Sequence, residues 1–307
     1  MLLHRIPLLL FAILALHGSL TRGEECECDL FSPSSVYYSN FFLSASMASR
    51  PLYPHATLGF QHIPKAGGTS VIQFLRTFSL TYFAEGVEQW HRFAFDADYD
   101  AWRSLSYQQQ KAVRIAEGVW FMRGEQPPLS QGNATALALH SVLSPLAVFT
   151  VLREPIALLV SEYNYVHYAT WEKSYIPPDK RVPFMQYAQM RAQQHVFLGT
   201  SHLVKSDLIR PYLLERFAVL GLLERFDETY KLLACAYGWP SEGSFPKENS
   251  GNPTKLVSLG EISDEDMKAL NELYARDVQL YNVVKEIFEE QLEALKGNEH
   301  TICNNAT

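Results

Sequence analysis

The stretch GFQHIPKAGGTSVIQFLRTF, residues 59–78, passes from an apolar segment through a proline, a lysine and two glycines into a second apolar segment. The apolar run before the turn predicts a buried strand over residues 57–63. The spacing of apolar residues after the turn predicts a helix over residues 69–78. A Gly-bearing turn between a strand and a helix presents free backbone N–H groups and the positive end of the helix dipole. This stretch therefore predicts an anion-binding turn at the end of a strand.

The residues of this turn have the chemistry that a phosphate or sulfate group requires. Lys65 supplies a positive charge, Thr69 and Ser70 supply hydroxyl donors, and Gly67 and Gly68 leave their backbone accessible. The turn is not a Walker A loop, because the lysine precedes the glycines and the order G-x-x-x-x-G-K-[ST] is absent. A purely structural turn is the alternative interpretation of the same residues.

The rest of the chain alternates apolar strand patterns with helical patterns. This order predicts an α/β fold with a largely parallel sheet that is flanked by helices, and a long amphipathic helix at the C-terminal end with one break in its pattern at Asp277. Strands are predicted over residues 114–121, 146–152 and 217–224, and helices over residues 99–114, 154–169, 183–198, 226–238 and 263–296.

Composition and charge restrict the class of protein. The 307 residues are 47% hydrophobic and 19% charged, which indicates one large globular domain over residues 55–300. The formal net charge of the whole chain is −7. Residues 261–300 alone account for it, because they hold eleven Asp or Glu against four Lys or Arg. The chain therefore has no basic surplus, and a nucleic-acid partner is disfavoured.

The first residues have the pattern of a targeting segment. A short basic start is followed by an apolar run over residues 6–16, which is shorter than a membrane-spanning helix requires. Residues 1–23 are predicted to be a signal peptide rather than a short signal anchor, and residues 24–54 an N-terminal stem. Both alternatives send the chain into the secretory pathway, the second as a single-pass type II membrane protein. N-glycosylation sequons at Asn133 and Asn305 agree with this.

Four cysteines, Cys26, Cys28, Cys235 and Cys303, allow three fully paired connectivities in an oxidising lumen. Pairing of Cys26 and Cys28 with the other two would tie both ends of the chain to the domain. The alternative leaves Cys235 as a buried free thiol in an apolar helix. No second close pair of Cys or His stands at ligand spacing, so no metal site is predicted.

A second stretch, FTVLREPIALLVSEYNY at residues 149–165, has a related pattern. Arg153 ends an apolar strand, and Ser161 lies eight residues later, about two turns into the following helix. Both residues would leave the sheet at its C-terminal edge, where α/β folds bind nucleotides. They are predicted to bind a second phosphate group. The alternative is that Arg153 is a solvated residue at the end of a strand.

Together the two stretches resemble the carbohydrate sulfotransferases of the Golgi, in particular the group of heparan sulfate 2-O- and 6-O-sulfotransferases and uronyl 2-O-sulfotransferases. HIPKAGGTS, residues 62–70, is similar to the family's 5′-phosphosulfate loop, and LREPIALLVSEY, residues 152–163, to its 3′-phosphate motif. The resemblance spans residues 57–295. It implies a P-loop-like fold, 3′-phosphoadenosine 5′-phosphosulfate (PAPS) as co-substrate, a glycan or glycoprotein acceptor, no obligatory metal, and a place in the Golgi lumen or outside the cell.

The resemblance also assigns roles to residues. Lys65 would contact the 5′-phosphate and the bridging oxygen of PAPS. The remaining cofactor contacts would be Gly67, Gly68, Thr69 and Ser70 around the phosphosulfate, and Arg153 and Ser161 at the 3′-phosphate.

The sequence departs from the family pattern in places. Leu158 stands where the family has a second arginine, whose loss would weaken cofactor binding or remove a structural ion pair. The family's histidine base is absent from IAEGVWFMRG, residues 115–124, so Glu117 is the candidate base and a surface residue is its alternative role. Gln194 resembles a family glutamine near the acceptor. His62 is expected to pack on its strand.

Three functions remain after these comparisons of motifs. The first is a PAPS-dependent sulfotransferase, the second a sulfotransferase-fold binding protein that has lost catalysis, and the third a nucleotide kinase or other P-loop NTPase. Residues 60–170 hold eight Lys or Arg against nine Asp or Glu, so the region of the proposed site has no surplus of basic residues. For the first function, this balance predicts a neutral or sparsely charged acceptor.

Overall fold

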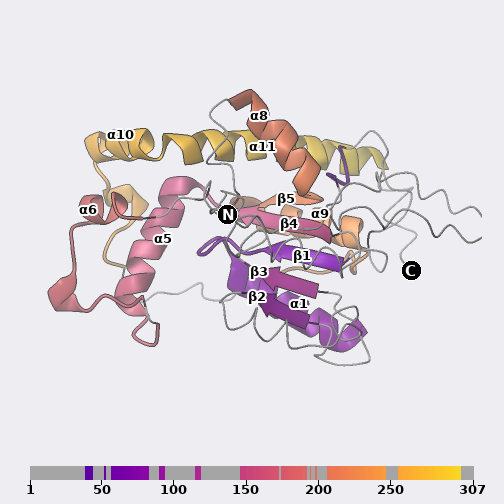
Figure 1. Cartoon of the computed structure of the whole chain (residues 1–307), viewed down its shortest axis with the longest axis horizontal. Helices are drawn as coiled ribbons and strands as arrows, with labels where there is room; N and C mark the ends of the chain where they lie inside the picture. Colours follow the sequence, from indigo (N-terminus) through magenta and orange to yellow (C-terminus); the bar gives the residue numbers. More distant parts are fainter. Residues whose placement is uncertain are drawn as a thin grey trace, which may run out of the picture.

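In the computed structural model, five parallel strands form one sheet in the order β2-β3-β1-β4-β5 (Figure 1). The structure describes residues 39–43, 52, 57–82, 90–93, 115–118, 146–172, 174–191, 194, 198, 206–246 and 255–298. The strands are β1 (Thr57–Gln61), β2 (Trp90–Phe93), β3 (Ile115–Gly118), β4 (Leu146–Leu152) and β5 (Val219–Leu222).

Helices follow the strands along the chain. The longest described helix is Ala275–Asn298, near the C-terminal end, and the second longest is Gly68–Tyr82, which follows β1. The prediction of an α/β fold with a parallel sheet, flanking helices and a long C-terminal helix is confirmed. Within the described residues, none of the helices combines the length and the apolar character that crossing a membrane requires. The α-helices are α1 (Gly68–Tyr82), α5 (Pro155–Tyr168), α6 (Phe184–Ala188), α8 (Ser206–Arg216), α9 (Phe226–Tyr237), α10 (Asp264–Leu273) and α11 (Ala275–Asn298), and the short 3-10 helices are η2 (Pro178–Lys180), η3 (Leu223–Arg225) and η4 (Leu259–Glu261).

Aromatic packing joins the middle of the sheet to the helices. Phe60 of β1 stacks on Phe149 of β4 with ring centroids 4.9 Å apart, and Phe149 meets the ring of Tyr237 at 5.8 Å. The Tyr237 hydroxyl donates to the carbonyl of Ala147 at 2.8 Å, so α9 is bonded directly to β4. On the helix side, Phe74 of α1 packs against the rings of Tyr230, Trp239 and Phe245.

The structure differs from the sequence prediction in four elements. Within the helix predicted over residues 183–198, α6 covers Phe184–Ala188 and a turn follows it, while Gln194 is again helical; residues 192–193 and 195–197 lie outside the described residues. Neither β2 nor α8, which contains Pro211, was predicted. The predicted helix over 263–296 is divided at Tyr274, whose ψ of 22° is not helical. The Tyr274 hydroxyl donates to the carbonyl of Ala188 at 2.9 Å, which ties this junction to α6. The helix predicted over 99–114 lies outside the described residues.

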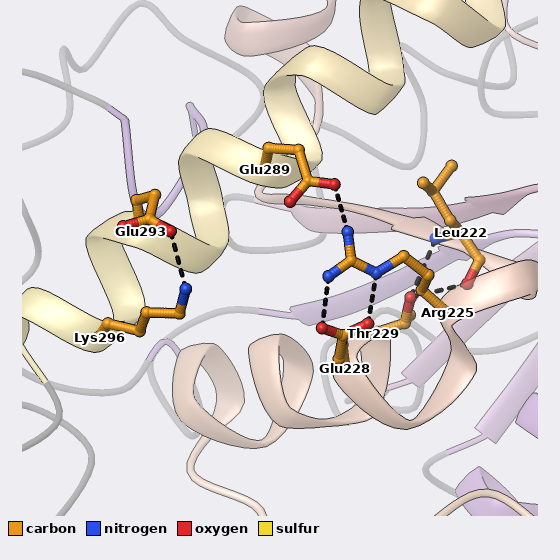
Figure 2. Close-up of polar contacts among 7 residues, drawn as sticks. All are labelled: Leu222, Arg225, Glu228, Thr229, Glu289, Glu293 and Lys296. Atoms are coloured by element: carbon orange, nitrogen blue, oxygen red, sulfur yellow. Dashed lines mark hydrogen bonds and ion pairs between the residues drawn. The ribbon is translucent and has the colours of Figure 1, made fainter.

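Within the described residues, the outer edge of β5 is bonded by side chains and not by another strand. The Gln291 amide of α11 accepts from the N–H of Leu220 at 3.1 Å and donates to its carbonyl at 2.8 Å. The Thr229 hydroxyl of α9 does the same for Leu222, at 2.9 Å in both directions (Figure 2). Asn40 donates to the Gln291 carbonyl oxygen at 3.0 Å. These bonds satisfy the backbone of an edge strand that would otherwise be open to pairing.

Charged pairs hold the start of α9 to α11, as Figure 2 shows. The guanidinium of Arg225 donates to both oxygens of Glu228 and also to Glu289 of α11. One turn further along α11, Lys296 pairs with Glu293 at 2.7 Å. The Lys296 pair is exposed at both ends and contributes little to stability. The Arg225 pairs instead fix the turn that follows β5.

Part of the predicted stem, residues 24–54, packs within the domain. Phe41, Phe42 and Leu52 are buried in the main hydrophobic core. The backbone N–H of Phe41 donates to the carbonyl of Ala218 at 2.8 Å. Cys235 of α9 is disulfide-bonded, with a partner outside the described residues, so the free-thiol alternative is wrong.

We expect Gln291→Ala to lower the free energy of unfolding by about 2–4 kcal/mol, because it leaves the buried N–H and C=O of Leu220 and the Asn40 amide without their partner. Denaturant unfolding measures this change. The matched control is Glu286→Ala on the exposed side of α11, expected within about 0.5 kcal/mol of the parent. Equal stabilities for the two variants would show that the edge of β5 does not need these bonds.

Candidate anion-binding site

The C-terminal ends of three neighbouring strands, β1, β4 and β5, open into one cavity of about 610 Å³. The chain leaves β1 toward β3 and β2 on one side and leaves β4 toward β5 on the other. Such a switch point between β1 and β4 leaves a crevice at the carboxyl edge of a parallel sheet, where α/β proteins bind ligands. The cavity is lined by residues from the turn after β1, from α5, from the turn after β5 and from residues 255–259.

The turn after β1 has a backbone that only particular residues tolerate. Lys65 has a φ of 67° and Gly67 a φ of 82°, both in the left-handed region. A Cβ at Gly67 would stand 2.7 Å from the Leu223 side chain, and one at Gly68 would stand 1.9 Å from Nε2 of His62. The positive φ of Gly67 favours glycine there, and a side chain at Gly68 would displace the His62 ring from its place beside the turn. The left-handed Lys65 is a strained conformation of the type that clusters at functional sites.

His62 lies at the entrance to this turn rather than within the strand. Its ring stacks on Phe60 with centroids 5.5 Å apart, and it lines the cavity beside Gly68. The prediction that His62 packs is confirmed by the Phe60 contact. Its position at the cavity wall was not predicted.

Lys65 places its ammonium group inside the cavity against an aromatic ring. The Nζ atom lies 3.4 Å from the ring centroid of Tyr165 on α5. Burial, followed by the positive charge of Arg153, lowers the pKa of Lys65 from 10.5 to about 8, while Glu162 and Glu172 oppose the shift. A cation held in this way has lost hydration and gains from an anionic ligand.

The Tyr165 ring is itself held from outside the helix. Its hydroxyl donates to Glu172 at 2.8 Å. Burial raises the pKa of the Tyr165 hydroxyl to about 12, the bond to Glu172 adds to this, and a side-chain hydrogen bond with Trp171 opposes it. The hydroxyl therefore stays protonated at neutral pH, and the ring stays oriented toward Lys65.

Arg153 joins the two predicted motifs directly. Its Nη1 atom donates to the backbone carbonyl of Lys65 at 3.2 Å, across 88 positions of sequence. Burial lowers the pKa of the Arg153 guanidinium, against the effect of Glu224 and Glu154. An arginine nevertheless remains charged in proteins. The second predicted cation thus lies beside the first.

Gln194 fixes the backbone of Arg153 from behind. The Gln194 side chain accepts from the Arg153 N–H at 3.1 Å and donates to the Arg153 carbonyl at 2.7 Å. The Gln194 N–H in turn donates to the buried carboxylate of Asp277 at 2.7 Å. Gln194 is buried and uses its amide on the Arg153 backbone, so its observed role is to position Arg153, and its likeness to a family glutamine near the acceptor stays a prediction. The break that Asp277 makes in the apolar pattern of the last helices is explained by the same contact.

Helix α5 begins at this point and directs one stripe of residues into the cavity. Glu154 accepts from the N–H groups of Ile156 and Ala157, at 3.2 and 2.6 Å, and so caps the helix. The stripe consists of Ala157, Val160, Ser161, Asn164, Tyr165 and Tyr168.

Asn164 holds a distant segment against α5. Its side chain accepts from the N–H of Leu256 at 2.7 Å and donates to the carbonyl of Val257 at 2.8 Å. These bonds place Lys255 and Ser258, which line the cavity. Lys255 thereby adds a third cation to the wall.

The structure brings all of the predicted cofactor contacts into this cavity, although their ligand roles stay predictions. For Glu117 the structure gives only the backbone, which pairs with Phe60 of β1 in the sheet. Leu158, which stands where the family has its second arginine, is buried in the main hydrophobic core, whereas its neighbour Ala157 lines the cavity. In this chain the position is therefore a core position. The predicted contacts in the wall are Lys65, Gly67, Gly68, Thr69, Ser70, Arg153 and Ser161.

Several cavity residues were missed by sequence reasoning. Those on α5 follow Ser161 at helical spacing, so extending the helix face from Ser161 would have found Asn164, Tyr165 and Tyr168. Lys255, Trp171 and Phe226 have no comparable signal, because they enter the wall from separate loops and elements. In the part of the chain that the structure describes, no group of three or more His, Cys, Asp or Glu could hold a metal ion.

We expect the affinity of the cavity for sulfate to fall by roughly tenfold or more as the pH rises through the Lys65 pKa of about 8, because the neutral amine no longer attracts the anion. Sulfate keeps its own charge over this range, and calorimetry from about pH 6.5 to about pH 9.5 measures the binding. Lys65→Arg, which stays charged, should flatten the profile. A profile that is the same in both proteins would remove Lys65 from the anion site.

The chain was also compared with models of known protein families and with curated proteins, and nothing matched. The features that bear on function are therefore the geometry and chemistry of this cavity and the motifs that line it.

Proposed function

We propose that this protein is a sulfotransferase that moves the sulfuryl group of PAPS to a hydroxyl of a glycan. The observation that carries the proposal is the convergence of two motifs, 88 positions apart, on one cavity, where Arg153 bonds to the carbonyl of Lys65. Each motif alone has a structural alternative. Lys65 with the two glycines of its turn, and Arg153 beside it, offer two groups that can each bind an anion, as a ligand with two anionic groups requires.

In this proposal the cavity holds the donor by its two anionic ends. Lys65 and the turn of Gly67, Gly68, Thr69 and Ser70 bind the 5′-phosphosulfate, with backbone N–H groups and the first turn of α1 as donors. Arg153 and Ser161 bind the 3′-phosphate, and the P-loop-like arrangement of strand, turn and helix positions both groups.

The chemistry is an in-line displacement at sulfur. The acceptor hydroxyl oxygen forms a bond to sulfur, the bond between sulfur and the bridging oxygen of the 5′-phosphate breaks, and 3′-phosphoadenosine 5′-phosphate (PAP) leaves. The hydroxyl proton passes to a base. Lys65 neutralises the charge that grows on the bridging oxygen, a contribution of electrostatic positioning that needs no metal ion.

Glu117 is the proposed base, and the acceptor is a neutral or sparsely charged glycan. The backbone of Glu117 lies opposite Phe60, two residues before His62 at the cavity. The balance of eight basic and nine acidic residues over 60–170 argues against a heavily sulfated acceptor. The targeting segment and sequons support action in the Golgi lumen or after secretion, with any membrane attachment through residues 1–23.

Two other functions make different predictions for the same cavity. A P-loop kinase would bind ATP in preference to PAP, and the order of lysine and glycines at residues 65–68 disfavours it. A sulfotransferase-fold protein without catalysis would bind PAP and transfer nothing. Calorimetry with PAP and ATP separates the kinase, and transfer of radiolabelled sulfate separates the non-catalytic protein.

We expect Arg153→Ala to weaken PAP binding by about 1.5–3 kcal/mol, because a charge-assisted contact to the 3′-phosphate is lost, and Ser161→Ala to weaken it less. Isothermal titration calorimetry measures both, with circular dichroism as the check of folding. Arg181→Ala, at an exposed arginine beyond α5, is the matched control. PAP bound equally by parent and Arg153→Ala would place the 3′-phosphate elsewhere.

We expect Lys65→Ala to lower the rate of sulfate transfer by roughly a hundredfold or more, the scale for loss of a positioned electrostatic donor. Glu117→Gln should abolish most of the transfer while leaving PAP binding unchanged, because the amide cannot accept the proton. Lys180→Ala, an exposed lysine, serves as control. Full transfer by Glu117→Gln would reject that residue as the base, and full transfer by folded Lys65→Ala would reject the donor site.

A further inference from the structure

Two exposed aromatic rings stand at one end of the cavity. Tyr168 ends α5 and Trp171 follows it in the next turn, with ring centroids 5.5 Å apart and planes at 86°. Trp171 is 67% exposed and Tyr168 36%, although both line the cavity. A ligand that covers these two rings gains free energy, because it removes their apolar surface from water.

Printed contacts connect the two cations to the aromatic pair. Arg153 bonds to the Lys65 carbonyl, and the Lys65 ammonium lies on the Tyr165 ring. Tyr168 follows about one helical turn beyond Tyr165 on α5, and its ring packs on that of Trp171.

Another part of the cavity wall has apolar residues of its own. Leu223 and Phe226 line the cavity beside Gly67. They come from the turn after β5 and the start of α9, not from the segment that carries Tyr168 and Trp171. They offer the base of a nucleotide an apolar surface other than the aromatic pair.

The charge near the aromatic pair favours a neutral ring. Glu172, next to Trp171, accepts the Tyr165 hydroxyl, and Lys255 lines the same cavity from the segment that Asn164 bonds to α5. The Glu172 carboxylate, next to Trp171 in the chain, disfavours a polyanion at the aromatic pair. A pyranose presents an apolar face of C–H groups that packs on an indole, and its hydroxyls can reach the polar edges of the two rings.

We infer that Tyr168 and Trp171 form an acceptor subsite, which binds the apolar face of a neutral pyranose and presents its hydroxyl to the sulfuryl group at Lys65. This inference rests on the proposed function for the identity of the donor. It adds the residues that bind the acceptor and the kind of sugar surface that they accept.

The test follows the indole resonance of Trp171 by NMR in protein with ¹⁵N-labelled tryptophan, saturated with PAP. Its resonance is assigned by its loss in Trp171→Phe. The probes are neutral hexose oligosaccharides, heavily sulfated oligosaccharides and a tyrosine peptide. We expect the neutral oligosaccharides to shift the Trp171 resonance and PAP alone to leave it in place.

The same variants are compared in sulfate transfer. Trp171→Ala should raise the KM for neutral oligosaccharides about tenfold with little change in kcat, and Trp171→Phe should raise the KM about threefold. The reason is that packing on the ring stabilises the bound sugar equally in the ground state and in the transition state. PAP affinity should stay at the parent value in both. Met190→Ala, at another exposed apolar side chain, is the control.

Each other outcome overturns the inference. A Trp171 resonance that moves with PAP, or PAP affinity lost in Trp171→Ala, would assign the rings to the nucleotide. A response to the tyrosine peptide or to sulfated chains alone would assign them to a different acceptor, and no response to any probe would remove the subsite. If the parent fails to bind PAP, the proposed function is wrong. The response of the Trp171 resonance to neutral sugars then still tests the sugar subsite by itself.

Discussion

The parallel pairing of β1 with β4 is the constraint on which the site depends. Their register sets Gln61 beside Thr150, and the Thr150 hydroxyl donates to the Gln61 carbonyl at 2.9 Å. β1 ends opposite Thr150 and β4 ends two residues later, at Leu152, so both strands end at the same edge of the sheet and the turns that follow them meet. The bond from Arg153 to the carbonyl of Lys65 is the direct result. An antiparallel pairing would have sent the two motifs to opposite ends of the sheet.

This convergence costs free energy in the empty protein. Two cations share a cavity, burial lowers the pKa of each, and Lys65 also adopts a left-handed backbone. Nothing in hydrophobic packing requires these features, and stability alone would favour their removal. The contacts around them hold them in place: Gln194 fixes Arg153, and Tyr165 lies under the lysine. An anion relieves the repulsion, which is a physical reason for such an arrangement.

The fold was predictable where the apolar pattern carries the information. β1, β4 and α5 are continuous apolar or periodic segments with clear ends, and the structure places them close to the predicted bounds. The failures have tertiary causes. The division at Tyr274 follows from its bond to the carbonyl of Ala188, and α8 contains Pro211, which helical patterns exclude. The burial of Phe41 beside the β5 strand follows from contacts across most of the chain length.

The site was predictable only in its anion-binding half. Lys65 and Arg153 belong to turns whose chemistry is local, so sequence spacing reveals them. The aromatic half is not local, because Trp171 and Lys255 approach α5 from different segments. Asn164 shows why pattern reading fails there: its position in the helix is ordinary, yet its amide holds the backbone of a segment 92 positions away. The sheet fixes the anion-binding turn, whereas side-chain bonds fix the segments that carry the other cavity residues. The residues that select a ligand can therefore change with those segments while the anion-binding turn stays the same.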